Sequence, residues 1–294
     1  MSSESPVSSG RTVVVTDSTA SLPSEVAAER GIVVVPLQVV IGAEVHDEGE
    51  GGATPEMVAA ALKSFTPVST SRPSPAAMTE VYERAVAEGA TEIVSVHISG
   101  DMSGTFESAQ LAARSASVPV VAVDSRQVGV ATGYAALAAA DVAAAGGTAA
   151  EAAAAAAARA EVSSSLFYVD TLEYLRRGGR IGAAAALLGG ALAVKPLLTI
   201  AEGRVESLER VRTSARAISR LEELAVEAAG DRPVDVCVAH LASADRAGAL
   251  AGRLGERLAE QLDGRDVWCG ELGAVLGAHV GPGMLAVCVA PRLC

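Results

Sequence analysis

Four short segments rich in hydroxyl groups and glycine carry most of the chemistry that this sequence offers. They are TDSTASLP at 16–23, TSRPS at 70–74, SGDMSGT at 99–105 and HVGPG at 279–283. Hydroxyls, backbone amides and an imidazole can each direct a hydrogen bond at a carboxylate, which accepts two or three of them. None of the segments contains a metal-ligand cluster or a phosphate-loop lysine. We therefore interpret them first as a binding site for one small acid.

Ser103 is the strongest candidate ligand in these segments. It stands just before a predicted helix, Thr105–Arg114, so Gly104 and the first-turn amides offer a partial positive charge to an anion. Serine in this position is also a common helix cap, and the two roles are compatible. Asp101, in the same segment, would repel a bound anion unless it points to solvent.

Thr70, Ser71 and His279 are the other candidate ligands. Pro73 disfavours helix just before it, so the first two residues are expected in an extended loop that faces a ligand, although a plain turn is the simpler alternative. Which of the two hydroxyls contacts a carboxylate stays open. His279 precedes two closely spaced glycines, which let backbone approach a ligand, but a lone histidine is more often structural.

A basic cluster lies in LEYLRRGGRIG at 172–182, where a predicted helix ends at two glycines. Its arginines are Arg176, Arg177 and Arg180. Favourable interaction with the helix C-terminus explains much of this clustering. On an acidic protein, however, the cluster also suggests a contact for phosphate or for an acidic partner.

Apolar runs of strand length alternate with helical patterns in the first half of the chain, which predicts a doubly wound parallel sheet. The expected strands are Thr12–Thr16, Ile32–Val40, Glu92–Ile98 and Val118–Val123, and the expected helices are Pro23–Arg30, Thr105–Arg114, Val128–Ala145 and Thr148–Arg159. Ligands bind beyond the carboxyl ends of strands in such sheets. Asp17, the 99–105 segment and Asp124 all fall there.

After about Val162 the pattern changes to that of an α+β domain. The expected strands are Leu166–Val169, Val194–Ile200, Arg204–Val211, Val234–Ala239 and Leu285–Ala290, and the expected helices are Thr171–Arg177, Ile181–Ala191, Ser214–Ala229 and Ala244–Leu262. AEGR at 201–204 predicts a hairpin turn with Gly203 at positive φ. We thus expect a disordered tail at 1–11, an α/β domain at 12–161 and an α+β domain at 162–294, with the ligand site between the domains.

Composition narrows the function further. The chain has 294 residues, 50% of them hydrophobic and only 3% aromatic, which predicts a large core of closely packed helices and sheet. A formal net charge of −12 opposes binding to nucleic acid and permits at most transient contact with anionic membranes. The N-terminus lacks the apolar run of a secretory signal, and the longest apolar run, Ala183–Val194, is too short to span a membrane. We expect a cytoplasmic protein.

The four cysteines show no CxxC spacing and no zinc-like pairing with histidine. Free, buried thiols are therefore expected, with no metal and no cofactor. A nucleotide site is not indicated either, because GxxxxGK[ST] is absent and no GxGxxG follows the first strand.

The order of these motifs resembles that of the DegV family. The chain contains TDSTASLP, TSRPS, SGDMSGTFESAQLA, VDSRQVG, LEYLRRGGRIG, KPLLTIAEGRV and HVGPG in the family's order, from Thr12 to Val289. The resemblance implies an N-terminal three-layer domain with a parallel sheet, and a C-terminal layered domain with a mixed sheet. It also implies that the protein binds a long-chain fatty acid.

The resemblance further implies which residues hold the acid. The carboxylate would contact Thr70 or Ser71, the SGT segment of Ser103, Gly104 and Thr105, and His279. Some members of the family are the binding subunit of a fatty acid kinase, which phosphorylates the carboxylate that they present. By this likeness Arg180 is the arginine expected to contact the partner or the phosphate.

Two other classes of function are compatible with parts of this pattern. A serine hydrolase would use Ser103 as nucleophile, His279 as base and Asp17 or Asp124 to orient the base, but the GxSxG elbow is absent. A purely structural interaction protein would have no internal cavity. We therefore expect a non-catalytic lipid-binding protein that has an apolar tunnel.

Overall fold

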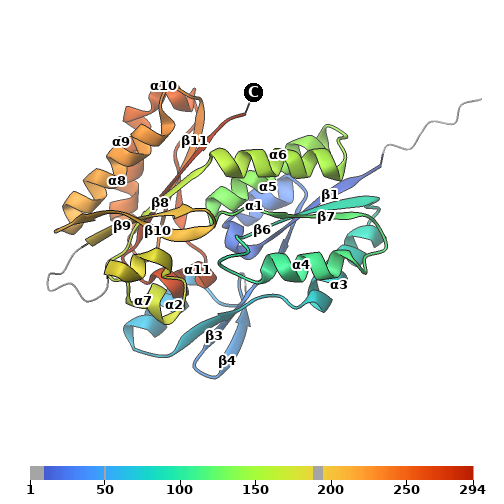
Figure 1. Cartoon of the computed structure of the whole chain (residues 1–294), viewed down its shortest axis with the longest axis horizontal. Coiled ribbons are helices and arrows are strands. Elements are labelled where there is room, and N and C mark those ends of the chain that lie inside the picture. The colour runs from blue at the N-terminus through green and yellow to red at the C-terminus, as the bar shows by residue number, and fades with distance from the viewer. Residues whose placement is uncertain (1–9, 50, 188–194, 294) are drawn as a thin grey trace, which may run out of the picture.

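The computed structural model describes residues 10–49, 51–187 and 195–293. The N-terminal lobe is built on a four-stranded parallel sheet, on the right of Figure 1. In spatial order its strands are β2 (Ile32–Val35), β1 (Thr12–Asp17), β6 (Glu92–His97) and β7 (Val120–Asp124). The strands are near-continuous apolar runs because helices cover both faces of the sheet.

Alternate residues of β1 pack into two separate cores, one on each face of the sheet. Because helices cover both faces, this lobe has three layers. Val13 and Val15 pack towards α3 (Pro75–Ala87) and α4 (Thr105–Ala113), while Val14 faces the alanines of two helices on the other side. Those helices are α5 (Val130–Ala144) and α6 (Ala149–Val162). Their contact is made largely by alanine, which lets the helix backbones approach closely without aromatic residues.

A small antiparallel sheet, at the bottom of Figure 1, is attached to this lobe. Its strands are β4 (Glu44–Asp47), β3 (Gln38–Ile41) and β5 (Val68–Ser71), and α2 (Pro55–Lys63) packs beside them. A helix from the far end of the chain, α11 (Ala274–Val280), completes this core through Ala274, Val275 and Ala278. The two ends of the sequence therefore share one hydrophobic cluster.

The C-terminal lobe, on the left of Figure 1, holds a six-stranded mixed sheet. Its strands, in spatial order, are β10 (Arg204–Val211), β9 (Lys195–Ala201), β8 (Ser164–Tyr168), β13 (Leu285–Pro291), β11 (Val234–His240) and β12 (Trp268–Glu271). One face packs on α8 (Ser214–Ala229), α9 (Ala244–Arg257) and α10 (Ala259–Leu262). The other face looks towards α5, α7 (Glu173–Arg177) and α11.

The predicted fold class is confirmed, and the differences lie in its details. The expected strand Ile32–Val40 is two strands in different sheets, because Pro36 interrupts it. The expected helix Ile181–Ala191 begins as a 3₁₀ segment, Gly182–Leu187, and its remainder lies outside the described residues. The expected tail at 1–11 also lies outside them, apart from Gly10 and Arg11.

Several elements were missed by the sequence patterns. These are η1 (Ser18–Ala20), the additional strands β4, β5 and β12, and the helices α2, α3 and α11, while α1 (Ser24–Glu29) and the hairpin turn at 201–204 follow the prediction. In that turn Glu202 and Gly203 both have positive φ, at 49° and 77°, as a two-residue hairpin loop demands.

The shared core under α11 leads to a stability prediction. Val39 of β3 is fully buried in that core, whereas Val45 of the neighbouring strand β4 is 58% exposed. Val39→Ala should lower the free energy of unfolding by about 2 kcal/mol in urea denaturation, because it leaves a cavity. Val45→Ala is the matched control and should change it by less than about 0.5 kcal/mol. Equal effects of the two substitutions would contradict this view of the core.

Candidate functional site

A cavity of about 420 Å³ lies between the two lobes. Its size is within the usual range for small-molecule sites. The walls are mostly apolar and come from both halves of the chain, with Leu37, Ile98 and Val128 on one side and Phe167, Ala239 and Ala286 on the other. Such a cavity suits an apolar ligand.

The polar groups of the cavity are concentrated where β5, the 99–104 loop and α11 meet. The residues that line the cavity here include five of the candidate ligands, Thr70, Ser71, Ser103, Gly104 and His279, and also Arg180, which the sequence analysis expected to contact a partner or a phosphate. Thr70 Oγ1 and His279 Nε2 are 2.9 Å apart in a hydrogen bond. Residues 209 positions apart in sequence thus contribute to one polar end.

Thr105 differs from the other predicted ligands because it does not line the cavity. It is fully buried behind Ser103, and the two hydroxyl oxygens are 2.8 Å apart. The amide of Thr105 also donates to Ser103 Oγ at 3.3 Å, so Ser103 combines a capping contact at α4 with a place on the cavity wall. Gly104 is the N-cap residue of that helix.

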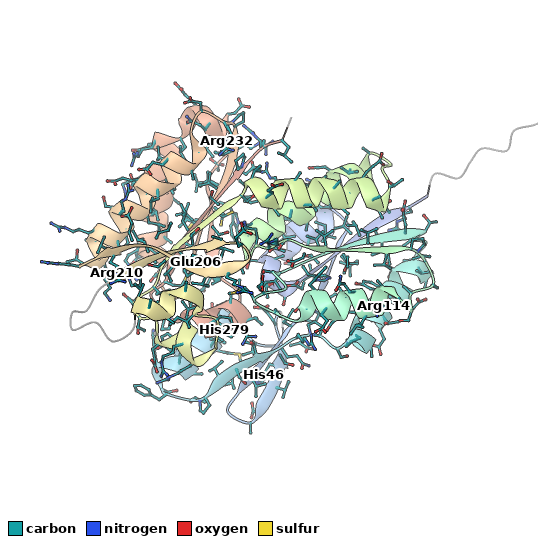
Figure 2. All side chains as sticks on the ribbon, in the orientation of Figure 1. His46, Arg114, Glu206, Arg210, Arg232 and His279 are labelled. Carbon is teal, nitrogen blue, oxygen red and sulfur yellow. The ribbon has the colours of Figure 1, made fainter. Side chains whose placement is uncertain are left out.

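His279 is held as a neutral imidazole. Burial, and secondarily the positive charge of Arg180, lower the pKa of His279 to about 4. Among the described residues its buried Nδ1 atom has no hydrogen-bond partner, and it lies against Gly178, where any Cβ would overlap it. Figure 2 shows this side chain on α11, in the region between the two lobes. At neutral pH the ring therefore offers one donor and one acceptor.

Arg180 is the one member of the basic cluster that reaches the cavity. Its guanidinium donates to the carbonyls of Met102, at 3.0 Å, and Gly178, at 2.6 Å. Arg176 and Arg177 instead form exposed ion pairs with Glu173 on their own helix. Arg180 thus fixes the loop that carries Ser103 against the end of α7.

Glu48 holds the other end of α11. Its Oε1 accepts a hydrogen bond of 2.8 Å from the amide of Val275, in the first turn of that helix. Its Oε2 is buried without a hydrogen-bond partner among the described residues, and desolvation raises the pKa of this carboxyl above its usual value. The small sheet therefore binds α11 twice, through Glu48 at the start and through Thr70 at His279.

The tip of the β9–β10 hairpin also joins the lobes, and its contacts determine where the charge of Asp101 points. Ser99 Oγ donates to the carbonyl of Gly203 at 2.7 Å, and Arg204 pairs with Asp101 at 2.7 Å. Asp101 does not line the cavity. The negative charge of Asp101 is therefore directed at Arg204, outside the polar end of the cavity.

The described residues do not form the catalytic triad of a hydrolase. His279 bonds to Thr70 and has no carboxylate at its other nitrogen, and Ser103 bonds to Thr105. Asp17 pairs with His97, at 2.8 Å, and Asp124 accepts from the backbone amides of Gly100 and Arg126. Neither aspartate orients His279.

A buried polar chain of Asp17, His97, Ser95 and Tyr82 runs through the parallel sheet instead. All four side chains are fully buried. Thr19, whose hydroxyl donates to Asp17, connects this chain to the cavity wall. This polar chain holds the loop after β1 in place and does not present a nucleophile to the cavity.

Sequence reasoning missed Glu48, Arg72 and Thr19 as residues of the site. Arg72 lines the cavity and donates to the carbonyl of Gly104 at 2.8 Å, which ties the TSRPS and SGDMSGT segments together. It stands inside a motif that was already singled out, so its charge was a usable signal. Glu48 follows an exposed hairpin and carries no comparable signal in the sequence.

Glu48 yields a testable prediction about the position of His279. Glu48→Ala removes the acceptor for the Val275 amide, so it should destabilise the protein by about 1 kcal/mol and raise the pKa of His279 by admitting water. Glu48→Gln retains an acceptor oxygen and should stay close to the parent protein. Chemical denaturation and NMR titration of the imidazole measure the two effects. Glu44→Ala, at an 80% exposed side chain of the same hairpin, is the control.

A second prediction concerns pH. Because the pKa of His279 is lowered from 6.5 to about 4 in the folded state, the unfolded state binds more protons between these values. The contribution of this residue to stability should be complete above pH 6.5 and should fall as the pH drops towards 4. His279→Gln should remove that part of the pH dependence in denaturation curves. An identical pH profile for the variant would contradict the assignment.

The described residues contain no group of three or more histidine, cysteine, aspartate or glutamate side chains placed to hold a metal ion. Within the same part of the chain, no helix combines the length and apolar character that crossing a bilayer would require.

Comparison with known proteins agrees with the geometry. Residues 11–292 match the model of the DegV family, which is described as uncharacterised. A DegV domain-containing protein of Streptomyces coelicolor is 52% identical over 279 residues, which cover 95% of this chain and 98% of that protein. A DegV domain-containing protein of Deinococcus radiodurans is 36% identical over 281 residues, with 95% and 98% coverage.

Solved structures extend the likeness to the fold. A fatty-acid-binding DegV family protein from Thermus thermophilus superposes with a TM-score of 0.88 at 32% identity, covering 96% of this chain and all of that one. DegV from Bacillus subtilis, described as a fatty acid binding protein, has a TM-score of 0.87 at 30% identity with the same coverage. With a family match across nearly its whole length and close relatives of the same fold, this chain belongs to the DegV family.

Proposed function

We propose that this protein binds one long-chain fatty acid, with the carboxylate at the polar end of the inter-lobe cavity and the alkyl tail along the six-stranded sheet. The observation that carries the proposal is an apolar cavity with three hydroxyl side chains, Thr70, Ser71 and Ser103, and a neutral imidazole gathered at one end. The fatty acids bound by the relatives from Thermus thermophilus and Bacillus subtilis support it.

The hydrogen bonds available at the polar end suit a carboxylate. A neutral His279 that donates from Nε2 to Thr70 Oγ1 leaves the threonine hydroxyl proton free for a ligand oxygen. Ser103 offers a second hydroxyl from the loop before α4, beside the first turn of that helix. Ser71 lines the same end and is the alternative to Thr70 as the closer contact of the carboxylate.

The tail should supply most of the affinity. Burial of each methylene contributes roughly 0.8 kcal/mol, so a sixteen-carbon acid gains about 12 kcal/mol before association costs are subtracted. A hydrogen bond to a charged group contributes about 1.5–3 kcal/mol. The head-group contacts therefore orient the carboxylate more than they retain the ligand.

We further propose that the protein presents the carboxylate to a fatty acid kinase and is not itself a catalyst. Neutral donors leave the carboxylate its negative charge and hence its nucleophilicity towards phosphorus. Arg180, the cavity-lining cation behind the SGT loop, would then interact with the phosphate or with the partner.

The most direct test is to identify the natural ligand. Purified protein should be denatured, extracted and analysed by mass spectrometry. A fatty acid of about 14 to 20 carbons, close to one per chain, is the expected result, since this tail length yields the burial described above. Protein that carries no lipid and takes up none from a fatty acid mixture would refute the proposal.

Ser103→Ala tests the head-group assignment. The loss of one hydrogen bond to a carboxylate should weaken binding about tenfold while leaving the cavity loaded at micromolar ligand. The ¹³C shift of palmitate labelled at the carboxyl carbon should change, and phosphorylation by a partner kinase should fall more than occupancy does. Ser108→Ala, which alters a buried hydroxyl without a hydrogen-bond partner on α4, is the control. Complete loss of ligand from Ser103→Ala alone would show that we have misjudged the roles of head and tail.

A further inference from the structure

The floor of the cavity is organised in rows across the three central strands of the mixed sheet. Ala239 of β11 faces Ala286 of β13, which faces Phe167 of β8. Two residues further along each strand, and hence on the same face, a second row follows. It consists of Cys237, Cys288 and Ser165, which are also directly paired.

The cavity ends at the second row. All three of its residues line the cavity, and on each of the three strands no residue beyond the row does so. The next pair in register on this face is Asp235 with Ala290. We call Cys237, Cys288 and Ser165 the terminal row. Along these three strands it is the last part of the cavity floor that a ligand can reach.

A buried charge lies directly behind the terminal row. Asp235 pairs with Arg159, whose side chain is largely buried, and with Arg265 at 2.7 Å. Arg159 also lies over the ring of Tyr134, 5.6 Å from its centre. A methyl group that pushed past the row would have to separate or desolvate these partners, which is costly.

The terminal row lies far from the polar end. Leu241, just after β11, packs against Gly277 of α11, and its carbonyl accepts a hydrogen bond from Gly283 in the loop that follows this helix. Cys237 lies four residues back along the strand, which corresponds to about 13 Å. A ligand anchored near His279 would therefore reach this row with its distal carbons.

We propose that the terminal row sets the maximum length of the acyl tail, with the methyl end of the fatty acid stopping against Cys237 and Cys288. This inference rests on the proposed function, since it assigns the tail end of the same ligand. The two thiols suit such a contact. Burial raises the pKa of Cys288 to about 12 and that of Cys237 also upwards, so both present neutral, weakly polar sulfur to the cavity.

The test is a chain-length series of saturated fatty acids from about ten to about twenty carbons, measured by displacement of a fluorescent fatty acid. For the parent protein, affinity should rise about fourfold per methylene up to one length and then stop rising. Cys237→Leu adds two heavy atoms at the terminal row, so that limit should move about two carbons shorter. Cys269→Leu is the matched control, because Cys269 is exposed on β12 and does not line the cavity.

A variant with the opposite expected effect on the length limit distinguishes a change in the cavity from a folding defect. Replacing both Cys237 and Cys288 with alanine enlarges the same end, so the limit should move about one or two carbons longer. If the parent protein shows a limit that neither variant moves, the tail does not end at this row and the inference is wrong. If the parent binds no acid of any length, the proposed function itself fails, which is a separate result.

Discussion

The organisation of this protein depends on keeping one uncharged imidazole in a dry contact between two lobes. His279 belongs to the C-terminal part of the sequence, yet its helix is embedded in the small sheet of the N-terminal lobe. Glu48 and Thr70 hold the two ends of that helix, and Gly178 leaves room for the ring. The polar end of the cavity therefore exists only while both lobes are together.

The two-residue period of the strands explains how the C-terminal sheet supports both a hydrophobic core and the wall of the cavity. On β13, Leu285, Val287 and Val289 face the helices α8 and α9, while the residues between them face the cavity side. The first set is large and branched, and Ala286 and Cys288 are small. One face thus contributes stability through packing, and the other leaves space.

The sequence predicted the parts of the structure that depend on local patterns. Apolar runs located most strands of the two main sheets, although β12 was missed, and the hydroxyl-rich motifs TSRPS and SGDMSGT proved to line the cavity through Thr70 and Ser103. Contacts that depend on distant residues were beyond such patterns. Nothing in the sequence around Glu48 shows that it accepts a hydrogen bond from Val275. Thr105 was predicted to be a ligand because the sequence does not reveal that it lies behind Ser103, which depends on the tertiary structure.

The hairpin between β9 and β10 has a further consequence for how the lobes respond to their surroundings. Its tip is joined to the N-terminal lobe by two ion pairs, Arg204 with Asp101 and Arg126 with Glu202, and the arginine of each pair is more than half exposed. Mobile counterions weaken exposed pairs of this kind, whereas the enclosed Thr70–His279 bond is shielded from them. Ionic strength therefore acts on the rim where the lobes meet and leaves the enclosed Thr70–His279 contact unchanged.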